Sequence, residues 1–196
     1  MRTDMSEYTA DGRGGNVSFS LLEGTRIIYI NGVIDQNMAY YFNTTLLRLE
    51  QEDSSKDIVV YINSPGGSVI DGLSMIDTMN LISCDVSTIC VGLAASMGAM
   101  LLMSGAKGKR KILPHSQVLI HQPLSNLGNS YRQASDLEIV AREAVKTKQN
   151  LYSIIHETTG QSYEKIEKDC DRDYTLSAKE ALDYGIVDEI ISSHKR

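Results

Sequence analysis

The chain has 196 residues, of which 42% are hydrophobic and 22% are charged, a composition typical of a globular domain with a sizeable core. Its formal net charge of −6 at pH 7 argues against a general attraction to nucleic acids or to anionic membranes. Three cysteines without a C-x-x-C pair argue against a disulfide framework and a zinc site, and no apolar run is long enough for a signal peptide or a membrane span, so we expect a cytoplasmic protein.

Local patterns predict strands and helices in alternation along most of the chain. Residues 1–18 are polar and without periodicity, which predicts a flexible N-terminal arm before a single domain at residues 19–196. Short β-branched runs predict buried strands, and apolar residues at helical spacing predict helices. In the first half these are strands at 26–30 and 58–62, a helix from a cap at Asp35 to about residue 51, a turn at 63–68 and a helix after it.

The second half continues in the same way. It has strands at 86–91, 111–113 and 117–121, a helix after Ser96 that ends near Gly105, and a last strand at 186–190. Residues 131–159 have the pattern of a long helix ending at Gly160, long enough to project beyond its own core. Ser162 is a candidate cap of a short helix, and Ser177 with Glu180 has the form of a capping box. The whole order predicts an α/β fold with parallel crossovers.

The segment Ala95-Ser96-Met97-Gly98 lies between a predicted strand and a predicted helix. A strand-turn-helix junction directs such a hydroxyl out of the sheet, beside the free N–H groups of the helix start. The structural alternative, without a catalytic role, is close packing of small residues with Ser96 as a helix cap. On this segment alone, capping is the better interpretation.

A general base and an oxyanion site are also available at predicted strand ends, where ligand sites of α/β folds lie. His121 ends a strand, although it could equally be a histidine of the core edge with a satisfied hydrogen bond. The N–H groups of Gly66, Gly67 and Met97 could hold an oxyanion, although an ordinary tight turn also explains the glycines. The carboxylate of a Ser-His-Asp set cannot be chosen by spacing, because 25 residues are Asp or Glu. No spacing of the four histidines suggests a metal site, and no glycine-rich nucleotide motif occurs.

Four motifs in this order resemble the ClpP family, the proteolytic subunits of the ATP-dependent Clp protease, from about Leu21 to the C-terminus. They are Tyr61-Ile62-Asn63-Ser64-Pro65-Gly66-Gly67-Ser68, Ala94-Ala95-Ser96-Met97-Gly98-Ala99, Ile120-His121-Gln122-Pro123-Leu124 and Asp171-Arg172-Asp173-Tyr174. The resemblance implies a crotonase-like fold of repeated βαβ units, with the long helix as a projecting handle. It also implies a serine endopeptidase without a cofactor, whose nucleophile, base and carboxylate fall on Ser96, His121 and Asp173, and whose oxyanion donors are the N–H groups of Gly67 and Met97.

The resemblance further implies how this subunit meets substrates and partners. An extended polypeptide would add as a strand beside residues 66–69, that is Gly66, Gly67, Ser68 and Val69, and beside Pro123 and Leu124. Asp171 and Arg172 align with a pair that the family uses for contact between its rings. Two stacked seven-membered rings, of this chain alone or mixed with a ClpP paralogue, would receive unfolded proteins from an AAA+ ATPase, in protein quality control, and would cleave short peptides directly.

Three features depart from the family: the arm at 1–18, Val59 where many members carry an aromatic residue of the ATPase-docking pocket, and a longer loop at 124–132. They leave two alternatives open besides an active protease. One is a weakly active or structural subunit that needs a paralogue in a mixed barrel. The other is an acyl-CoA hydratase or hydrolase on the same fold.

Overall fold

The computed structural model describes residues 19–22, 24–123 and 133–191. Within them, eight strands form one sheet in the order β1-β2-β3-β4-β5-β8, with β6 paired to β4 and β7 paired to β6. The strands are β1 (Phe19–Leu21), β2 (Ile27–Asn31), β3 (Ile58–Ser64), β4 (Val86–Ala95), β5 (Arg110–Ile112), β6 (Gln117–Ile120), β7 (Tyr174–Ser177) and β8 (Glu189–Ile190). The expected α/β class and the mostly parallel sheet are confirmed.

The helices begin and end close to the residues that the sequence indicates. They are α1 (Gln36–Glu52), α2 (Val69–Leu81), α3 (Met97–Met103), α4 (Ala134–Thr159), α5 (Tyr163–Asp169) and α6 (Ala178–Tyr184). The three caps predicted from sequence are present: Asp35 accepts the Met38 N–H at 2.9 Å, Ser162 caps α5, and Ser177 forms the capping box of α6 with Glu180. Gly160 and Gly185 end their helices in the left-handed conformation.

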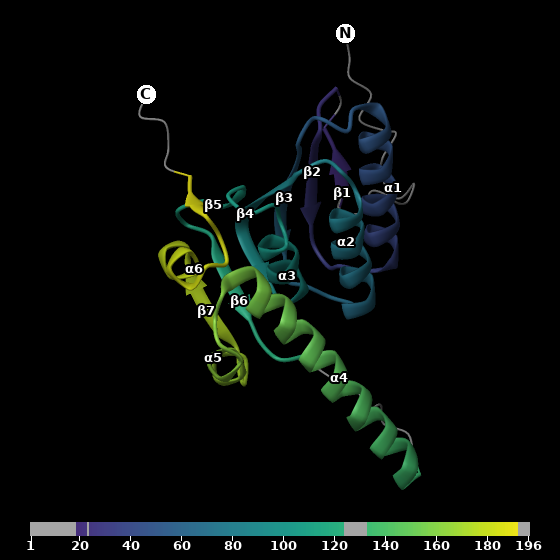
Figure 1. Ribbon diagram of the computed structural model, residues 1–196, viewed down its shortest axis with the longest axis vertical. Helices are drawn as coiled ribbons and strands as arrows, with labels where there is room; N and C mark the ends of the chain where they lie inside the picture. Colours follow the sequence, from purple (N-terminus) through teal and green to yellow (C-terminus); the bar gives the residue numbers. More distant parts are fainter. Residues whose placement is uncertain (1–18, 23, 124–132, 192–196) are drawn as a thin grey trace.

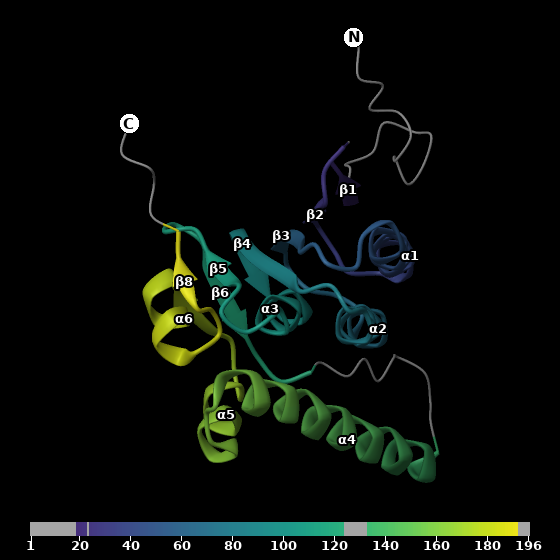
Figure 2. The ribbon, with the colours of Figure 1, turned by 45° about the horizontal axis from the view of Figure 1, so that its top comes forward.

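The buried residues lie between the sheet and its helices. Helices α1, α2 and α3 lie in a row along one face of the sheet, and α4 follows next to α3 (Figure 2). The core between these elements includes Ile28, Phe42, Ile62, Met75 and Leu101, each at most 1% exposed. Helix α6 packs on β6, β7 and β8 at the other end of the sheet (Figure 1).

Strand β4 is longer than the sequence indicates, since it continues through Gly92 to Ala95 where a turn is expected from residue 92. Gly92 has a φ of +84°, and the pairing of β3 with β4 shifts register at this point. Side chains from neighbouring segments satisfy the displaced backbone: Ser116 Oγ accepts the Gly92 N–H at 2.8 Å, and Asn63 Oδ1 accepts the Leu93 N–H at 3.3 Å. The irregularity redirects β4 from β5 to β6, so that Ala94 and Ala95 pair with Val118 and Leu119.

Helix α4 extends well past the sheet, as Figure 1 shows. Its C-terminal half packs on the core through Leu151, Tyr152 and Ile155, which are 3–6% exposed. Leu137, Ile139 and Val145 in its N-terminal half are 45–58% exposed. The core of this chain therefore covers apolar side chains in the C-terminal half of α4 and leaves these three in the N-terminal half uncovered.

Candidate active site

Ser96 lies at the junction between β4 and α3 in a strained backbone conformation. Its φ of +53° is the only positive value of a non-glycine residue in the described part of the chain, and such a conformation costs about 1–3 kcal/mol and is frequent at functional sites. The Ser96 N–H donates to Leu119 O at 2.8 Å, which holds the junction against β6. The hydroxyl makes no capping hydrogen bond with α3. The capping interpretation is therefore wrong, and the backbone of α3 does not occupy this hydroxyl.

The glycine turn between β3 and α2 contacts this junction directly. A Cβ atom on Gly66 would lie 2.7 Å from Ala95 O and 2.7 Å from Ser96 Cβ. A Cβ atom on Gly67 would lie 2.1 Å from Ile34 O. Only glycine therefore allows the backbone of this turn to approach both Ser96 and Ile34 so closely.

Two backbone donors remain free beside Ser96. Ile34 pairs with the turn by donating to Gly66 O and accepting from Ser68 N, each at 2.9 Å. Because successive residues of an extended chain direct their N–H groups to opposite sides, the Gly67 N–H points away from Ile34. Within the described residues neither this N–H nor the Met97 N–H in the first turn of α3 has a hydrogen-bond partner. The pair has the chemistry of an oxyanion site.

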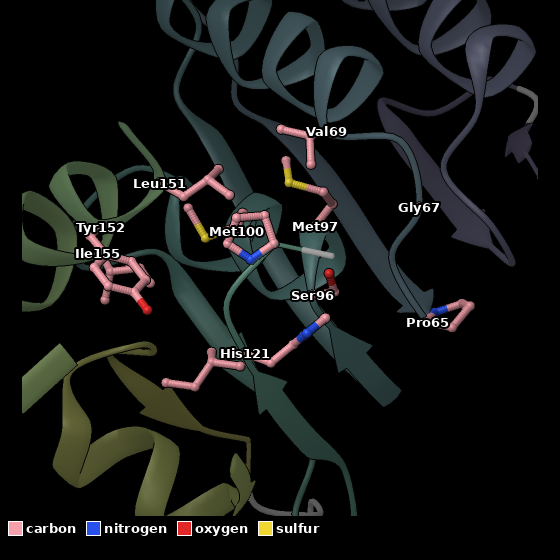
Figure 3. A pocket seen from close by; sticks show the side chains of 12 residues that line it. Pro65, Gly67, Val69, Ser96, Met97, Met100, His121, Leu151, Tyr152 and Ile155 are labelled. Carbon is pink, nitrogen blue, oxygen red and sulfur yellow. The ribbon is translucent and has the colours of Figure 1, made fainter. Parts of the chain in front are cut away.

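His121 follows β6, whose pairing with β4 brings it beside Ser96. Both residues line one cavity of about 250 Å³ together with Pro65, Gly67 and Met97. The His121 side chain extends toward Ser96 in Figure 3. The described part of the chain contains no hydrogen bond between Ser96 and His121. Catalytic hydrogen bonds are often long in a site without substrate.

Asp173 is an exposed residue that the register of β6 and β7 places opposite His121, and the described residues show no hydrogen bond between the two side chains. Strand β7 pairs antiparallel with β6, with Ile120 opposite Tyr174, and the residues next in line are His121 and Asp173. These two, with Gln122, Asp171 and Arg172, line a second hollow. Gln122 holds the segment in place by donating its side-chain amide to Asp171 O at 2.9 Å and its N–H to Cys170 O at 2.7 Å.

The remaining candidate residues divide into those near the cavity and those away from it. Val69 and Pro123 line the cavity, and Ser68 caps α2 next to it. Asp171 and Arg172 are 67% and 90% exposed and form no close ion pair, with 3.9 Å between Asp171 Oδ2 and Arg172 Nε. Leu124, the loop at 124–132 and the arm at 1–18 lie outside the described residues.

Apolar side chains form most of the cavity wall, and several of them are not among the site residues predicted from the sequence. Met100 from α3 and Leu151 and Ile155 from α4 face the space that opens beside Ser96 (Figure 3). Tyr152 from α4 also lines it, and burial raises the pKa of its phenol to about 12. The helical stripe at residues 151–155 was the only sequence signal, and it indicates burial without saying against what.

The described residues contain no group of three or more His, Cys, Asp or Glu side chains arranged to hold a metal ion. None of the helices within the described ranges is both long and apolar enough to cross a membrane.

Comparison with known proteins gives one consistent result. A family model described as Clp protease matches residues 12–194. The ATP-dependent Clp protease proteolytic subunit 2 of Prochlorococcus marinus (strain NATL2A) is 53% identical over 174 residues, which are 89% of this chain and 86% of the relative. The ATP-dependent Clp protease proteolytic subunits of Porphyromonas gingivalis and Bacteroides fragilis are 51% and 49% identical, over 91% and 95% of this chain and 79% and 91% of the relatives.

Proposed function

The chain belongs to the Clp protease family of serine peptidases, and from this premise we propose that it hydrolyses peptide bonds with Ser96, His121 and Asp173. The observation that carries the proposal is the convergence of Ser96, His121 and the free N–H groups of Gly67 and Met97 at one cavity. In this arrangement His121 removes the Ser96 proton, and the hydroxyl oxygen attacks the substrate carbonyl. Asp173 orients the imidazole and supports its positive charge.

The two backbone donors stabilise the oxygen of the tetrahedral intermediate, and each such donor is worth about 3–4 kcal/mol in comparable sites. Collapse of the intermediate transfers the His121 proton to the leaving amine and leaves an acyl group on Ser96. Water, activated by the same imidazole, then releases the acyl group and restores the hydroxyl. No cofactor takes part in this sequence.

The substrate binds as an added strand. The Gly66 carbonyl and the Ser68 N–H form hydrogen bonds with the backbone of Ile34. The opposite edge of the turn, from Gly67 to Val69, therefore faces an incoming chain. Pro123 and Leu124 flank the chain on its other side. Backbone pairing of this kind is insensitive to side chains, so many unfolded polypeptides and short peptides are substrates.

Residues 19–196 act as one protease domain within a larger assembly. The subunit has a crotonase-like fold, and α4 is its handle helix, which packs between two heptameric rings. Its N-terminal half supplies exposed apolar side chains for this contact, namely Leu137, Ile139 and Val145. Asp171 and Arg172 contribute to the same ring-to-ring contact. An AAA+ ATPase in the cytoplasm delivers unfolded proteins to the enclosed sites.

The rings contain this chain alone or a paralogue as well. Several relatives carry numbered names, proteolytic subunit 2 or 3, which supports mixed rings. Native mass spectrometry of the purified protein, alone and mixed with a conventional ClpP, measures the composition of the rings. A peptidase assay of the same samples shows whether this chain is active without a paralogue.

Replacement of the nucleophile tests the proposed reaction. Ser96→Ala removes only the attacking oxygen, so we expect the assembly to persist and hydrolysis of a short fluorogenic peptide to be lost. Activity of the Ser96→Ala protein equal to that of the unchanged protein contradicts the proposal. Turnover of an enoyl-CoA or acyl-CoA thioester, without peptide hydrolysis, would point to the hydratase or hydrolase alternative.

A further inference from the structure

Ser64, the last residue of β3, has a buried hydroxyl that no step of the proposed reaction uses. The residue is 1% exposed. Its hydroxyl accepts the Gly66 N–H at 3.0 Å and donates to Gly32 O at 2.7 Å. One side chain therefore joins the glycine turn after β3 to the loop that follows β2.

These two hydrogen bonds complete the pairing of the turn with the loop after β2. Ile34 in this loop donates to Gly66 O and accepts the Ser68 N–H, each at 2.9 Å. The Gly66 N–H points elsewhere and is satisfied by the Ser64 hydroxyl. Among the described residues, the Gly67 N–H is then the one backbone donor between Gly66 and Ser68 that has no partner.

Ser64 also limits how closely the first turn of α3 approaches the glycine turn. A Cβ atom on Gly98 would lie 3.0 Å from Ser64 O and 3.2 Å from Ser64 Cβ, so the backbone at Gly98 packs directly on Ser64. Gly98 follows Met97, whose N–H is the second donor beside Ser96. Ser64 therefore contacts both segments that carry the two free donors.

We propose that Ser64 is a positioning residue of the oxyanion site, whose hydroxyl fixes the spacing between the Gly67 N–H and the Met97 N–H. In Ser64→Ala the buried Gly66 N–H loses its acceptor, which is unfavourable. The turn can relieve this by moving, because its glycines adopt many backbone conformations. The inference rests on the proposed peptidase function for its catalytic meaning, whereas the spacing of the two donors is measurable without turnover.

Peptide hydrolysis by Ser64→Ala measures the consequence for the reaction. Oxyanion donors act mainly on the transition state, so a displaced donor lowers kcat and leaves KM nearly unchanged. We expect kcat to fall by about 10- to 100-fold, because a donor removed outright costs about 100- to 1,000-fold. A general loosening of the cavity would instead raise KM, and that result would overturn the inference.

A second variant covers the case in which Ser64→Ala does not fold. Ser64→Cys keeps a side chain of nearly the same shape, but a thiol is a weaker donor and a weaker acceptor than a hydroxyl. We expect Ser64→Cys to lower kcat in the same direction and by a smaller factor. Ser64→Cys with the kcat of the unchanged protein would contradict a role of these hydrogen bonds.

Ser116 supplies the matched control, because its hydroxyl makes the same pair of contacts elsewhere. It is 3% exposed, accepts the Gly92 N–H at 2.8 Å and donates to Cys90 O at 3.2 Å. The hollow that Ser116 and Gly92 line does not contain Ser96. Ser116→Ala therefore lowers the Tm as Ser64→Ala does and keeps its kcat. Equal losses of kcat in the two variants overturn the inference.

Crystal structures of the unchanged protein, Ser64→Ala and Ser116→Ala separate this inference from the proposed function. We expect the distance between Gly67 N and Met97 N to change in Ser64→Ala only. A turn that keeps its place in Ser64→Ala, with a water where the hydroxyl was, overturns the inference even if the chain is a peptidase. If the unchanged protein hydrolyses no peptide, alone or mixed with a conventional ClpP, the peptidase proposal fails, and the measured distance still decides the inference.

Discussion

A methyl group added at Gly66 tests whether the glycine turn and Ser96 form one reaction site. In Gly66→Ala the new Cβ atom would meet Ala95 O and Ser96 Cβ at 2.7 Å and Met97 N at 3.0 Å, and real Cβ contacts under 3.0 Å essentially do not occur. The turn and the Ser96 junction must therefore move apart by at least 0.3 Å, the difference between these two distances. The movement separates the Gly67 N–H from the Met97 N–H and from the Ser96 hydroxyl.

The expected effect is a fall of about 100-fold in kcat/KM. Loss of one oxyanion donor costs a factor of about 100 to 1,000 in rate, and the displaced turn takes the Gly67 N–H out of the position of such a donor. A fluorogenic peptide assay measures the rate, and thermal unfolding and native mass spectrometry verify fold and assembly.

Gly108→Ala is the matched control for backbone strain. Gly108 has a φ of +84°, close to the +93° of Gly66, but a Cβ atom there would meet nothing within 4 Å. Both substitutions should cost about 1–2 kcal/mol of stability from the left-handed backbone, while Gly108→Ala keeps its activity. Loss of less than a factor of three in Gly66→Ala, or an equal loss in both variants, would refute the reasoning.

Two further predictions concern buried groups outside the site. Arg110 is 4% exposed, and 2.6 Å separates its Nη2 from Asp188 Oδ1. Asp188→Asn removes the carboxylate that balances this buried charge, so we expect the free energy of unfolding to fall by about 3–5 kcal/mol and the Tm by about 6–20 °C. The control Asp85→Asn changes an exposed ion pair and costs at most about 1 kcal/mol. Burial alone would raise the pKa of Asp188, but hydrogen bonds from Arg110 hold this pKa below the ordinary 3.8. The Tm difference between the unchanged protein and Asp188→Asn is therefore full above about pH 4 and shrinks as the pH falls through the pKa of the folded state. A Tm difference that grows on acidification contradicts this assignment. Burial raises the pKa of Cys90 and Cys170 to about 12, so neither thiol of the folded protein reacts with a disulfide reagent at pH 8, as peptide mapping would show, whereas both react after unfolding.

Local sequence signals predict most elements because their causes are local. Asp35, Ser162 and Ser177 cap helices through side chains only three residues from their backbone partners. The strand runs at 26–30 and 58–62 are β-branched and central in the sheet, so burial and propensity agree. The nucleophile junction could be located for the same reason, although not distinguished from a cap.

The proposed carboxylate, Asp173, could not be chosen by spacing, without the family resemblance, because its position depends on long-range pairing. Strand β7 has one buried residue, Leu176, and three exposed ones, so no clear alternation marks it as a strand. Its antiparallel pairing with β6 brings Asp173 beside His121, 52 positions earlier in the numbering. The sequence predicted parallel crossovers between the strands it identified, and it did not identify β1 and β7, which pair antiparallel with β2 and β6.

The place of Tyr152 in the cavity wall could not be predicted from the sequence, because it also depends on tertiary packing. Its neighbours Leu151 and Ile155 belong to a stripe that predicts packing, and a tyrosine beside such a stripe commonly reaches solvent with its hydroxyl. Only the tertiary packing of α4 shows that Tyr152 is buried and that it belongs to the cavity wall.

Covalent labelling of the intact protein tests the central claim most directly. A fluorophosphonate reacts with a serine whose hydroxyl is activated by a neighbouring base, and peptide mapping by mass spectrometry identifies the modified residue. Phosphonylation at Ser96, lost in Ser96→Ala and strongly slowed in His121→Ala, is the expected result. A protein that hydrolyses peptides while Ser96 stays unmodified, or that is labelled at another serine with equal loss of activity, would contradict the account.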